Sequence, residues 1–447
     1  MLLTSGAICR SSGTQPAAFT LKYWTVYTDT ANIQPVIDAY QLKYPYISIE
    51  LTQFRPEEYE DKLIEAWAQG EGPDIFSVPN NHLGAFTDLI TPIPSSLDMT
   101  SVTVTKSLGQ KQTVVADEVI KGIVPQQIST LFPQVVYDDV VKSGSDGKSL
   151  AKVYGLPISL DMMVLYYNKN LLDQANIPLP ATTWDDFVKQ VPALTLVDVN
   201  DNIIQSGAAI GTSDNVPRMF DIVSLLMMQN GSTMTVGDSV TFDQPAARGD
   251  DTIPGIDAVN FYTSFANPAV EWYSWTAEKP DALEDFVAGN VAYFLGYYYQ
   301  LETIQDRGGQ LDFDIAPVPQ VSSDPQAAVN VANYWLESVS VNSTHPDASW
   351  TFVQALTTNE QNVTAILTAN PQPAALRTLI SDQQTGDDLT LAVFANEALS
   401  AQSWYAGKKP AEAEAAFADM VDIINEGRLD TTTAVTNTAS KVELTYE

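Results

Sequence analysis

The fold is indicated most clearly by residues 19–54, which read FTLKYWTVYTDTANIQPVIDAYQLKYPYISIELTQF. Apolar and polar residues alternate over 19–24, the pattern of a half-buried strand. Apolar residues then recur at helical spacing over 33–44, and Pro45 ends that helix. Alternation returns over 47–51. The stretch therefore predicts a strand, a helix and a second strand.

The same alternation of elements continues along the chain. A helical stripe over 59–67 closes at Gly70, and the apolar segment DIFSVP at 74–79 predicts a third strand. This β-α-β-α-β order predicts a parallel sheet with crossover helices. Ligands of open parallel sheets bind at the carboxyl ends of the strands, so the segments that follow each strand are the candidate site.

Later segments are also α/β in character. Residues 95–150 are expected to be less regular and partly helical, and 216–231 to form a buried helix. Thr183 is expected to cap a helix that begins at Trp184. A chain of 447 residues exceeds the roughly 250–300 residues that one hydrophobic core supports, so two lobes are expected.

Composition excludes several classes of function. The formal net charge is −33, which repels nucleic acid and anionic membranes, so no nucleic-acid partner is expected. One cysteine and two histidines leave no set of ligands for a zinc site, and no calcium-loop motif is present, so neither a metal nor a cofactor is expected.

Catalytic motifs are absent from the sequence. It holds no G-x-S-x-G, H-E-x-x-H, G-x-x-x-x-G-K-[ST] or G-x-G-x-x-G segment. Carboxylate pairs of a glycoside hydrolase stay open as an alternative, because 55 acidic residues offer many pairs. The sequence predicts a binding protein and not an enzyme.

Aromatic residues are the positive signal. Flat apolar rings with polar edges suit sugar rings, and planar polar side chains suit sugar hydroxyls, although a single aromatic residue is often part of a core. The candidate positions are Trp24, Tyr27, Asn80, Asn81, Asp161, Tyr297, Tyr298, Tyr299, Tyr334, Trp335, Gln372 and Trp404.

Seven segments together resemble the family 1 extracellular solute-binding proteins of ABC importers, the group that includes maltose-binding protein. They are YWTVYTD (23–29), AYQLKYPYISIEL (39–51), GPDIF (72–76), YGLPISLDMMVLYYNKNLL (154–172), PATTWDDF (180–187), FVAGNVAYFLGYYY (286–299) and IAPVPQ (315–320). The resemblance runs from about residue 19 to the end of the chain, with the segments in the family's order.

The resemblance implies a two-lobed periplasmic-binding-protein-like clamp of α/β lobes, with several hinge crossings. Lobe one would hold 19–157 and 320–372, and lobe two 158–319 and 373–447. Ligand would bind in the cleft, and hinge closure would bury it. The segments PISLD, FLGYYY, ANPQPAAL and AQSWYAG nominate Ser159, Asp161, Tyr297, Tyr298, Tyr299, Gln372 and Trp404 as ligand-binding residues.

The expected function is capture of a sugar or oligosaccharide outside the cytoplasm, by a monomer that delivers it to ABC permease subunits in the membrane. A carbohydrate-active enzyme and a binding protein for a non-sugar solute are the alternatives. Residues 1–18 would be a leader or tether, and Cys9 after the segment MLLTSGAI would be lipidated if a lipoprotein signal has been clipped.

Overall fold

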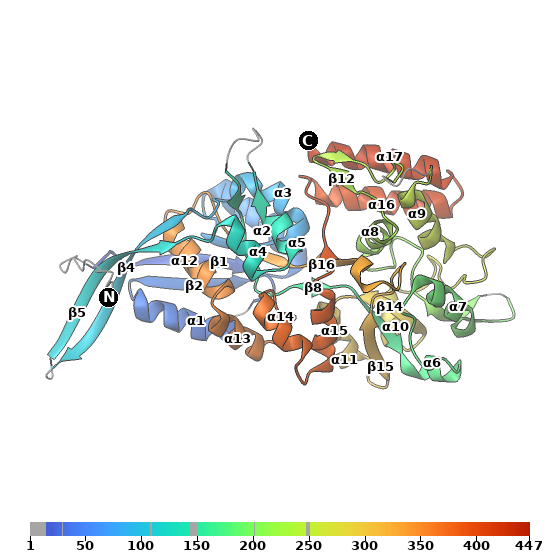
Figure 1. Ribbon diagram of the computed structural model, residues 1–447, viewed down its shortest axis with the longest axis horizontal. Helices are drawn as coiled ribbons and strands as arrows, with labels where there is room; N and C mark the ends of the chain where they lie inside the picture. Colours follow the sequence, from blue (N-terminus) through green and yellow to red (C-terminus); the bar gives the residue numbers. More distant parts are fainter. Residues whose placement is uncertain (1–14, 29, 108–109, 144–149, 201, 247–250) are drawn as a thin grey trace, which may run out of the picture. The chain divides into compact units, whose positions relative to one another are not determined.

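The computed structural model describes residues 15–28, 30–107, 110–143, 150–200, 202–246 and 251–447 (Figure 1). The described chain forms two compact units. Unit 1 holds the residues up to Asn80, Phe86–Ser159 and Tyr334–Leu379, and unit 2 holds Asn81–Ala85, Leu160–Asn333 and Ile380–Glu447. Neither unit is continuous in sequence. Cys9 lies outside the described residues.

Unit 1 is built on a four-stranded sheet with the order β17-β3-β1-β2. Its strands are β1 (Phe19–Thr25), β2 (Ile47–Gln53), β3 (Ile75–Pro79) and β17 (Trp335–Val339). The first three are parallel, as the sequence predicts, whereas β17 arrives from far along the chain and pairs antiparallel with β3.

Helices of unit 1 bury apolar side chains, some against this sheet and some against other helices. They are α1 (Thr30–Lys43), α2 (Pro56–Gln69), α4 (Pro125–Leu131), α5 (Gln134–Val140), α12 (Pro346–Thr357) and α13 (Glu360–Ala369). α2 ends as predicted at Gly70, whose φ of 73° is left-handed and whose N–H reaches the carbonyl oxygens of Ala66 and Trp67. The expected early helices and strands are therefore confirmed.

The expectation of an irregular, partly helical segment over 95–150 is wrong for its first part. β4 (Ser96–Ser107) and β5 (Gln110–Lys121) form a long antiparallel hairpin, and only α4 and α5 follow as helices. Near its base Leu97 and Met99 are buried, and Figure 1 shows the far halves of both strands extending away from the sheet of unit 1. The β-branched run SVTVT at 101–105 is typical of a strand and is the signal that was overlooked.

Two short strands complete unit 1, β6 (Val141–Lys142) and β7 (Lys152–Val153). The 3₁₀ helix η2 (Thr87–Leu89) also belongs to it. Three further elements lie at the unit boundaries, namely η1 (Asn80–His82), α3 (Leu83–Phe86) and α14 (Arg377–Gln384).

Unit 2 contains a five-stranded sheet, a three-stranded sheet and a small hairpin. The orders are β10-β11-β14-β9-β15, β18-β16-β8 and β12-β13. The strands are β8 (Asp161–Met162), β9 (Val164–Asn168), β10 (Leu196–Val197), β11 (Ile203–Ala208), β12 (Thr235–Val236), β13 (Ser239–Val240), β14 (Val291–Gly296), β15 (Phe313–Pro317), β16 (Asn330–Asn333) and β18 (Ala401–Gln402).

Helices pack around these sheets. They are α6 (Lys169–Gln174), α7 (Trp184–Leu194), α8 (Met219–Gln229), α9 (Pro254–Ser264), α10 (Ala282–Val287), α11 (Leu301–Arg307), α15 (Leu389–Glu397), α16 (Pro410–Asn425) and α17 (Thr431–Glu443), with 3₁₀ helices η3 (Tyr298–Gln300), η4 (Pro325–Ala327) and η5 (Leu444–Tyr446). The buried helix expected over 216–231 is α8, and Thr183 caps α7 by accepting from Asp186 N–H, so both predictions are confirmed.

Segment 320–333, which the resemblance placed in lobe one, packs in unit 2. The reason is β16, which pairs with β8 and β18. Residues 158–159 and 373–379, placed in lobe two, pack in unit 1, where Ser159 forms a bridge with Ala374. No helix among the described residues is both long and apolar enough to cross a bilayer.

Candidate ligand-binding site

Unit 1 gathers aromatic side chains at the carboxyl ends of its parallel strands. Tyr27 follows β1 and meets Trp335, the first residue of β17, edge to face with ring centres 5.6 Å apart. Trp335 also contacts Tyr59, and Trp24 at the end of β1 lies 4.7 Å from Phe54. Tyr27 is 43% exposed. The sheet thus brings Trp24, Tyr27 and Trp335 into one group with an accessible ring.

Asn80 and Tyr334 are buried and are hydrogen-bonded to each other. Asn80 N–H donates to the Tyr334 carbonyl oxygen over 2.9 Å, and Tyr334 N–H donates to Asn80 Oδ1 over 3.3 Å. Both side chains also donate to Oδ2 of buried Asp139 on α5. Burial raises the pKa of Tyr334 well above its ordinary value, with the Asp139 carboxylate adding to the shift. The structure therefore places Asn80 and Tyr334 in the interior of unit 1.

Unit 2 holds the three consecutive tyrosines at the end of β14. Tyr297 is fully buried, whereas Tyr299 is 42% exposed and stacks on Tyr297 with ring centres 6.0 Å apart. Tyr298 is half-buried and meets Phe394 of α15 edge to face. The first tyrosine is thus a core residue, and the next two carry the accessible rings.

Asp161 fixes the backbone of these tyrosines. Its carboxylate, on β8, accepts from Tyr298 N–H over 2.7 Å and from Tyr299 N–H over 3.1 Å. Burial raises the pKa of Asp161 to about 7, although these two N–H groups, Met162 N–H and the Arg218 charge act to lower it. Asp161, which lies on β8, therefore caps the N-terminus of η3.

Replacing Asp161 by alanine is expected to loosen this turn. The N–H groups of Tyr298 and Tyr299 lose their acceptor, so their hydrogen exchange should accelerate about tenfold or more, as expected for losing one good hydrogen bond. Amide exchange resolved by residue is the measurement. Asp161→Asn keeps an acceptor oxygen and should show a smaller effect, and unchanged exchange in the alanine variant would contradict this role.

Sequence reasoning missed a charged pair beside the tyrosines. Arg218 Nε and Nη2 contact Asp221 Oδ2 at 2.7 and 2.6 Å, and the Tyr297 hydroxyl donates to the same oxygen over 2.7 Å. The guanidinium also lies over the Tyr297 ring, 5.8 Å from its centre. Arg218 and Asp221 are three residues apart at the start of α8, an ordinary spacing on helices that is no motif for a binding site. Only the fold brings Tyr297 to this pair.

Trp404 is held in a defined orientation on unit 2. Its ring stacks on Phe220 of α8 with centres 5.6 Å apart, and its Nε1 donates to Ser224 Oγ over 2.9 Å. The side chain is half-buried and also contacts Phe417. A ring fixed in this way offers a preorganised apolar surface.

The remaining candidates are dispersed. Asn81 Nδ2 donates to Glu414 Oε1 over 3.5 Å within unit 2. Ser159 and Gln372 lie in unit 1, where the Ser159 bridge to Ala374 brings the two segments together, and both side chains are partly exposed.

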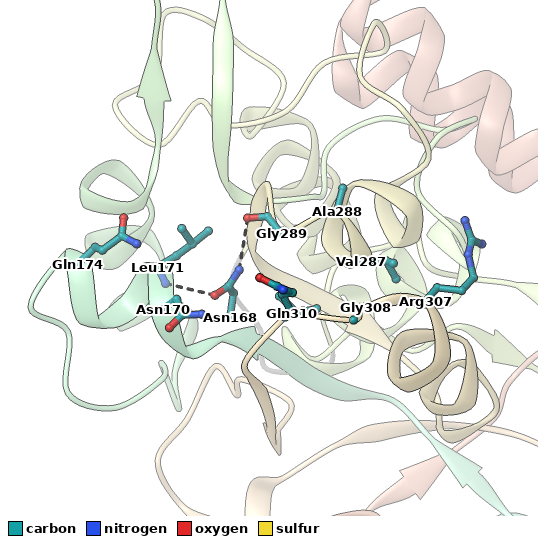
Figure 2. A pocket seen from close by; sticks show the side chains of 12 residues that line it. Asn168, Asn170, Leu171, Gln174, Val287, Ala288, Gly289, Arg307, Gly308 and Gln310 are labelled. Atoms are coloured by element: carbon teal, nitrogen blue, oxygen red, sulfur yellow. Dashed lines mark hydrogen bonds between the residues drawn. The ribbon is translucent and has the colours of Figure 1, made fainter.

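Figure 2 shows a polar hollow of about 410 Å³. It lies at the start of β14, whereas the tyrosines follow the end of that strand. It is found where β9 ends and where β14 and β15 begin, and Asn168, Asn170, Gln174 and Gln310 contribute amides to it. Asn168 is already engaged, since it donates to the Gly289 carbonyl oxygen and accepts from Leu171 N–H. The lining includes no aromatic ring among the described residues. The hollow therefore lacks the accessible ring surface that Tyr27 and Tyr299 provide elsewhere.

Metal-binding chemistry is not indicated by the described residues, in which no three His, Cys, Asp or Glu side chains lie close enough together to hold an ion. The accessible rings and polar side chains of each unit can instead contact a polar organic solute through stacking and hydrogen bonds.

A family model agrees with this interpretation. Residues 36–379 match the model described as bacterial extracellular solute-binding protein. The chain therefore belongs to the bacterial extracellular solute-binding protein family, and the resemblance found in the sequence is confirmed.

Solved structures show the same fold at low sequence identity. A cyclo/maltodextrin-binding protein complexed with maltotetraose matches at 16% identity and a TM-score of 0.71, over 97% of this chain and 98% of that one. The cyclic alpha-maltosyl-1,6-maltose binding protein of Arthrobacter globiformis matches at 15% and 0.71, over 96% and 99%. The sugar-binding protein MalE of Xanthomonas citri matches at 16% and 0.70, over 96% and 97%. The fold class predicted from the sequence is confirmed.

Proposed function

We propose that this protein captures a sugar or oligosaccharide and delivers it to the membrane permease of an ABC importer, without chemically changing it. The membership in an extracellular solute-binding family supports the binding role. Attachment through a lipid on Cys9 and action as a monomer stay predictions.

The observation that carries the sugar assignment is the pair of accessible aromatic groups. Tyr27 of unit 1 and Tyr299 of unit 2 are each more than 40% exposed although each contacts another aromatic ring. Accessible rings with polar edges offer flat apolar faces on which sugar rings can stack. The structural relatives were solved with or named for maltotetraose, cyclic maltosyl-maltose and sugar, which supports the same class of ligand.

A thermal-shift screen tests this function. Neutral mono- and oligosaccharides, amino acids, peptides and polyamines are compared, and a solute present at 100 times its dissociation constant should add about 2.7 kcal/mol to the free energy of unfolding. Stabilisation by a non-sugar solute alone would overturn the sugar assignment. Release of shorter products from a labelled oligosaccharide would overturn the absence of catalysis and favour the enzyme alternative.

Replacing either Trp404 or Tyr298 by alanine is expected to weaken binding of the stabilising sugar by about 1–3 kcal/mol, as for other well-packed aromatic residues at binding sites. Isothermal titration of each variant measures the change. Trp272→Ala is a matched control, because Trp272 is also a half-buried tryptophan of unit 2 whose Nε1 donates to a serine, here Ser264. Equal loss in the control, or no loss in either variant, would contradict the assignment.

A further inference from the structure

Arg218 has an unfavourable backbone conformation. Its φ of 60° and ψ of 30° are left-handed, and among the described residues only Asn176 and Arg218 have positive φ without being glycine. Asparagine tolerates this region, whereas a long side chain rarely adopts it. Residues held in such conformations cluster at ligand-binding positions, where the surrounding structure compensates for the strain.

The Arg218 side chain is partly accessible to solvent. It is 28% exposed, and within the described chain its hydrogen bonds and ion contacts all go to Asp221, from Nε and Nη2. The Nη1 donors are therefore left for another partner. The guanidinium lies over the Tyr297 ring, on which the exposed Tyr299 also stacks, and its charge interacts with the Tyr299 hydroxyl as well.

The guanidinium charge is compensated by Asp221, and further acidic groups lie around it. Asp221 contacts it directly, and the carboxylates of Asp161 and Glu414 act on it from a greater distance. An anionic ligand would approach an arginine whose charge is already compensated, next to further carboxylates. A neutral ligand with adjacent hydroxyl groups is not repelled by these carboxylates, and its hydroxyl oxygens can accept hydrogen bonds from the planar N–H donors.

We propose that Arg218 is a ligand-binding residue of unit 2, and that its ion pair with Asp221 restricts the protein to uncharged sugars. This inference rests on the proposed function and deepens it, because it names the charge class of the ligand and the two residues that set it.

The test compares maltotetraose with the same tetrasaccharide carrying one glucuronate residue, by isothermal titration at low salt. The unmodified protein should bind the neutral form at least tenfold more tightly. Asp221→Asn removes the compensating charge and should shift the ratio of the two affinities at least tenfold toward the glucuronate form. Arg218→Gln should weaken maltotetraose binding about tenfold, and Arg218→Lys should not restore it, because an ammonium lacks the planar fork.

Asp285→Asn is the matched control, since Asp285 forms a buried ion pair with Lys279 at 3.0 Å in the same unit. It should leave the ratio unchanged. A ratio that does not move in Asp221→Asn, or unchanged binding in Arg218→Gln, would overturn the role of this pair and leave the sugar assignment intact. If the unmodified protein binds no neutral saccharide, the proposed function fails and this inference fails with it.

A second measurement tests the strain without any ligand. Arg218→Gly and Arg218→Ala both lack the guanidinium, but only glycine is relaxed at this φ. The glycine variant should therefore melt about 2–4 °C above the alanine variant. Equal melting temperatures would contradict backbone strain at Arg218.

Discussion

Replacing Trp350 by alanine is expected to destabilise unit 1 by about 3–5 kcal/mol, the usual cost of removing a large aromatic side chain from a core. Trp350 is on α12 and is fully buried, and its Nε1 donates to the Thr91 carbonyl oxygen over 2.9 Å. Its neighbour Phe352 packs on Tyr23 of β1 and Tyr40 of α1. A late segment of the chain therefore completes a core that begins in the first strand.

Urea unfolding, followed by a probe in each unit, measures this cost. Two units need not unfold in one step, so the transition of unit 1 should move while that of unit 2 moves less. Leu42→Ala is the control, because Leu42 is 82% exposed in the same unit and its loss should cost less than about 0.5 kcal/mol. A loss below about 1 kcal/mol for Trp350→Ala would show that α12 does not complete the core.

Replacing Glu337 by glutamine is expected to stabilise the protein above pH 7 by up to about 3 kcal/mol. Glu337 is on β17 and only 3% exposed, and it accepts from Ser77 Oγ over 2.8 Å. Burial raises its pKa from 4.5 to about 7, which at 1.36 kcal/mol for each tenfold change in proton affinity gives about that free energy. The tyrosines beside it, Tyr23 and Tyr59, stay neutral because burial, together with the Glu337 charge, raises their pKa further.

The sign follows from proton binding. Between pH 4.5 and about 7 the folded protein keeps the Glu337 proton that the unfolded chain releases, so the free energy of unfolding falls as the pH rises. Glutamine cannot titrate, and the variant should lose this part of the pH dependence. Asp161 and Glu397, whose pKa burial also raises to about 7, titrate in both proteins and cancel in the comparison. Parallel stability curves from pH 4.5 to 8 would contradict the prediction.

The sequence predicted those parts of the fold that depend on local periodicity. Strands and helices over 19–79 and the cap at Thr183 were found because each has its own apolar pattern or turn residue. The hairpin of β4 and β5 was missed because the β-branched run at 101–105 was given too little weight, and its pairing with 112–116 is not specified by a local apolar pattern. The antiparallel addition of β17 to β3 depends on a pairing across about 260 residues, which no local pattern specifies.

The candidate site shows the same division. Trp24, Tyr27 and Trp335 were predicted because they lie at strand ends. The carboxyl ends of parallel strands lie on the same side of a sheet, and the order of strands and helices in the sequence is enough to predict this. Burial could not be predicted, so the sequence did not separate core Tyr297 from exposed Tyr299. Arg218 was missed because an Arg–Asp pair three residues apart is common on helices, and because neither its left-handed backbone nor its contact with the Tyr297 ring follows from the local sequence.

The interrupted order of the two units has a consequence for how the chain matures. During synthesis from the N-terminus, the sheet of unit 1 lacks β17 until residues 335–339 emerge, and unit 2 lacks α16 and α17 until the end. Contacts between distant segments also form slowly. Neither unit can therefore complete its core early, and we expect the growing chain to stay incompletely folded for most of its synthesis. For a protein of an extracellular family, a chain that folds late is still able to pass through a narrow protein channel.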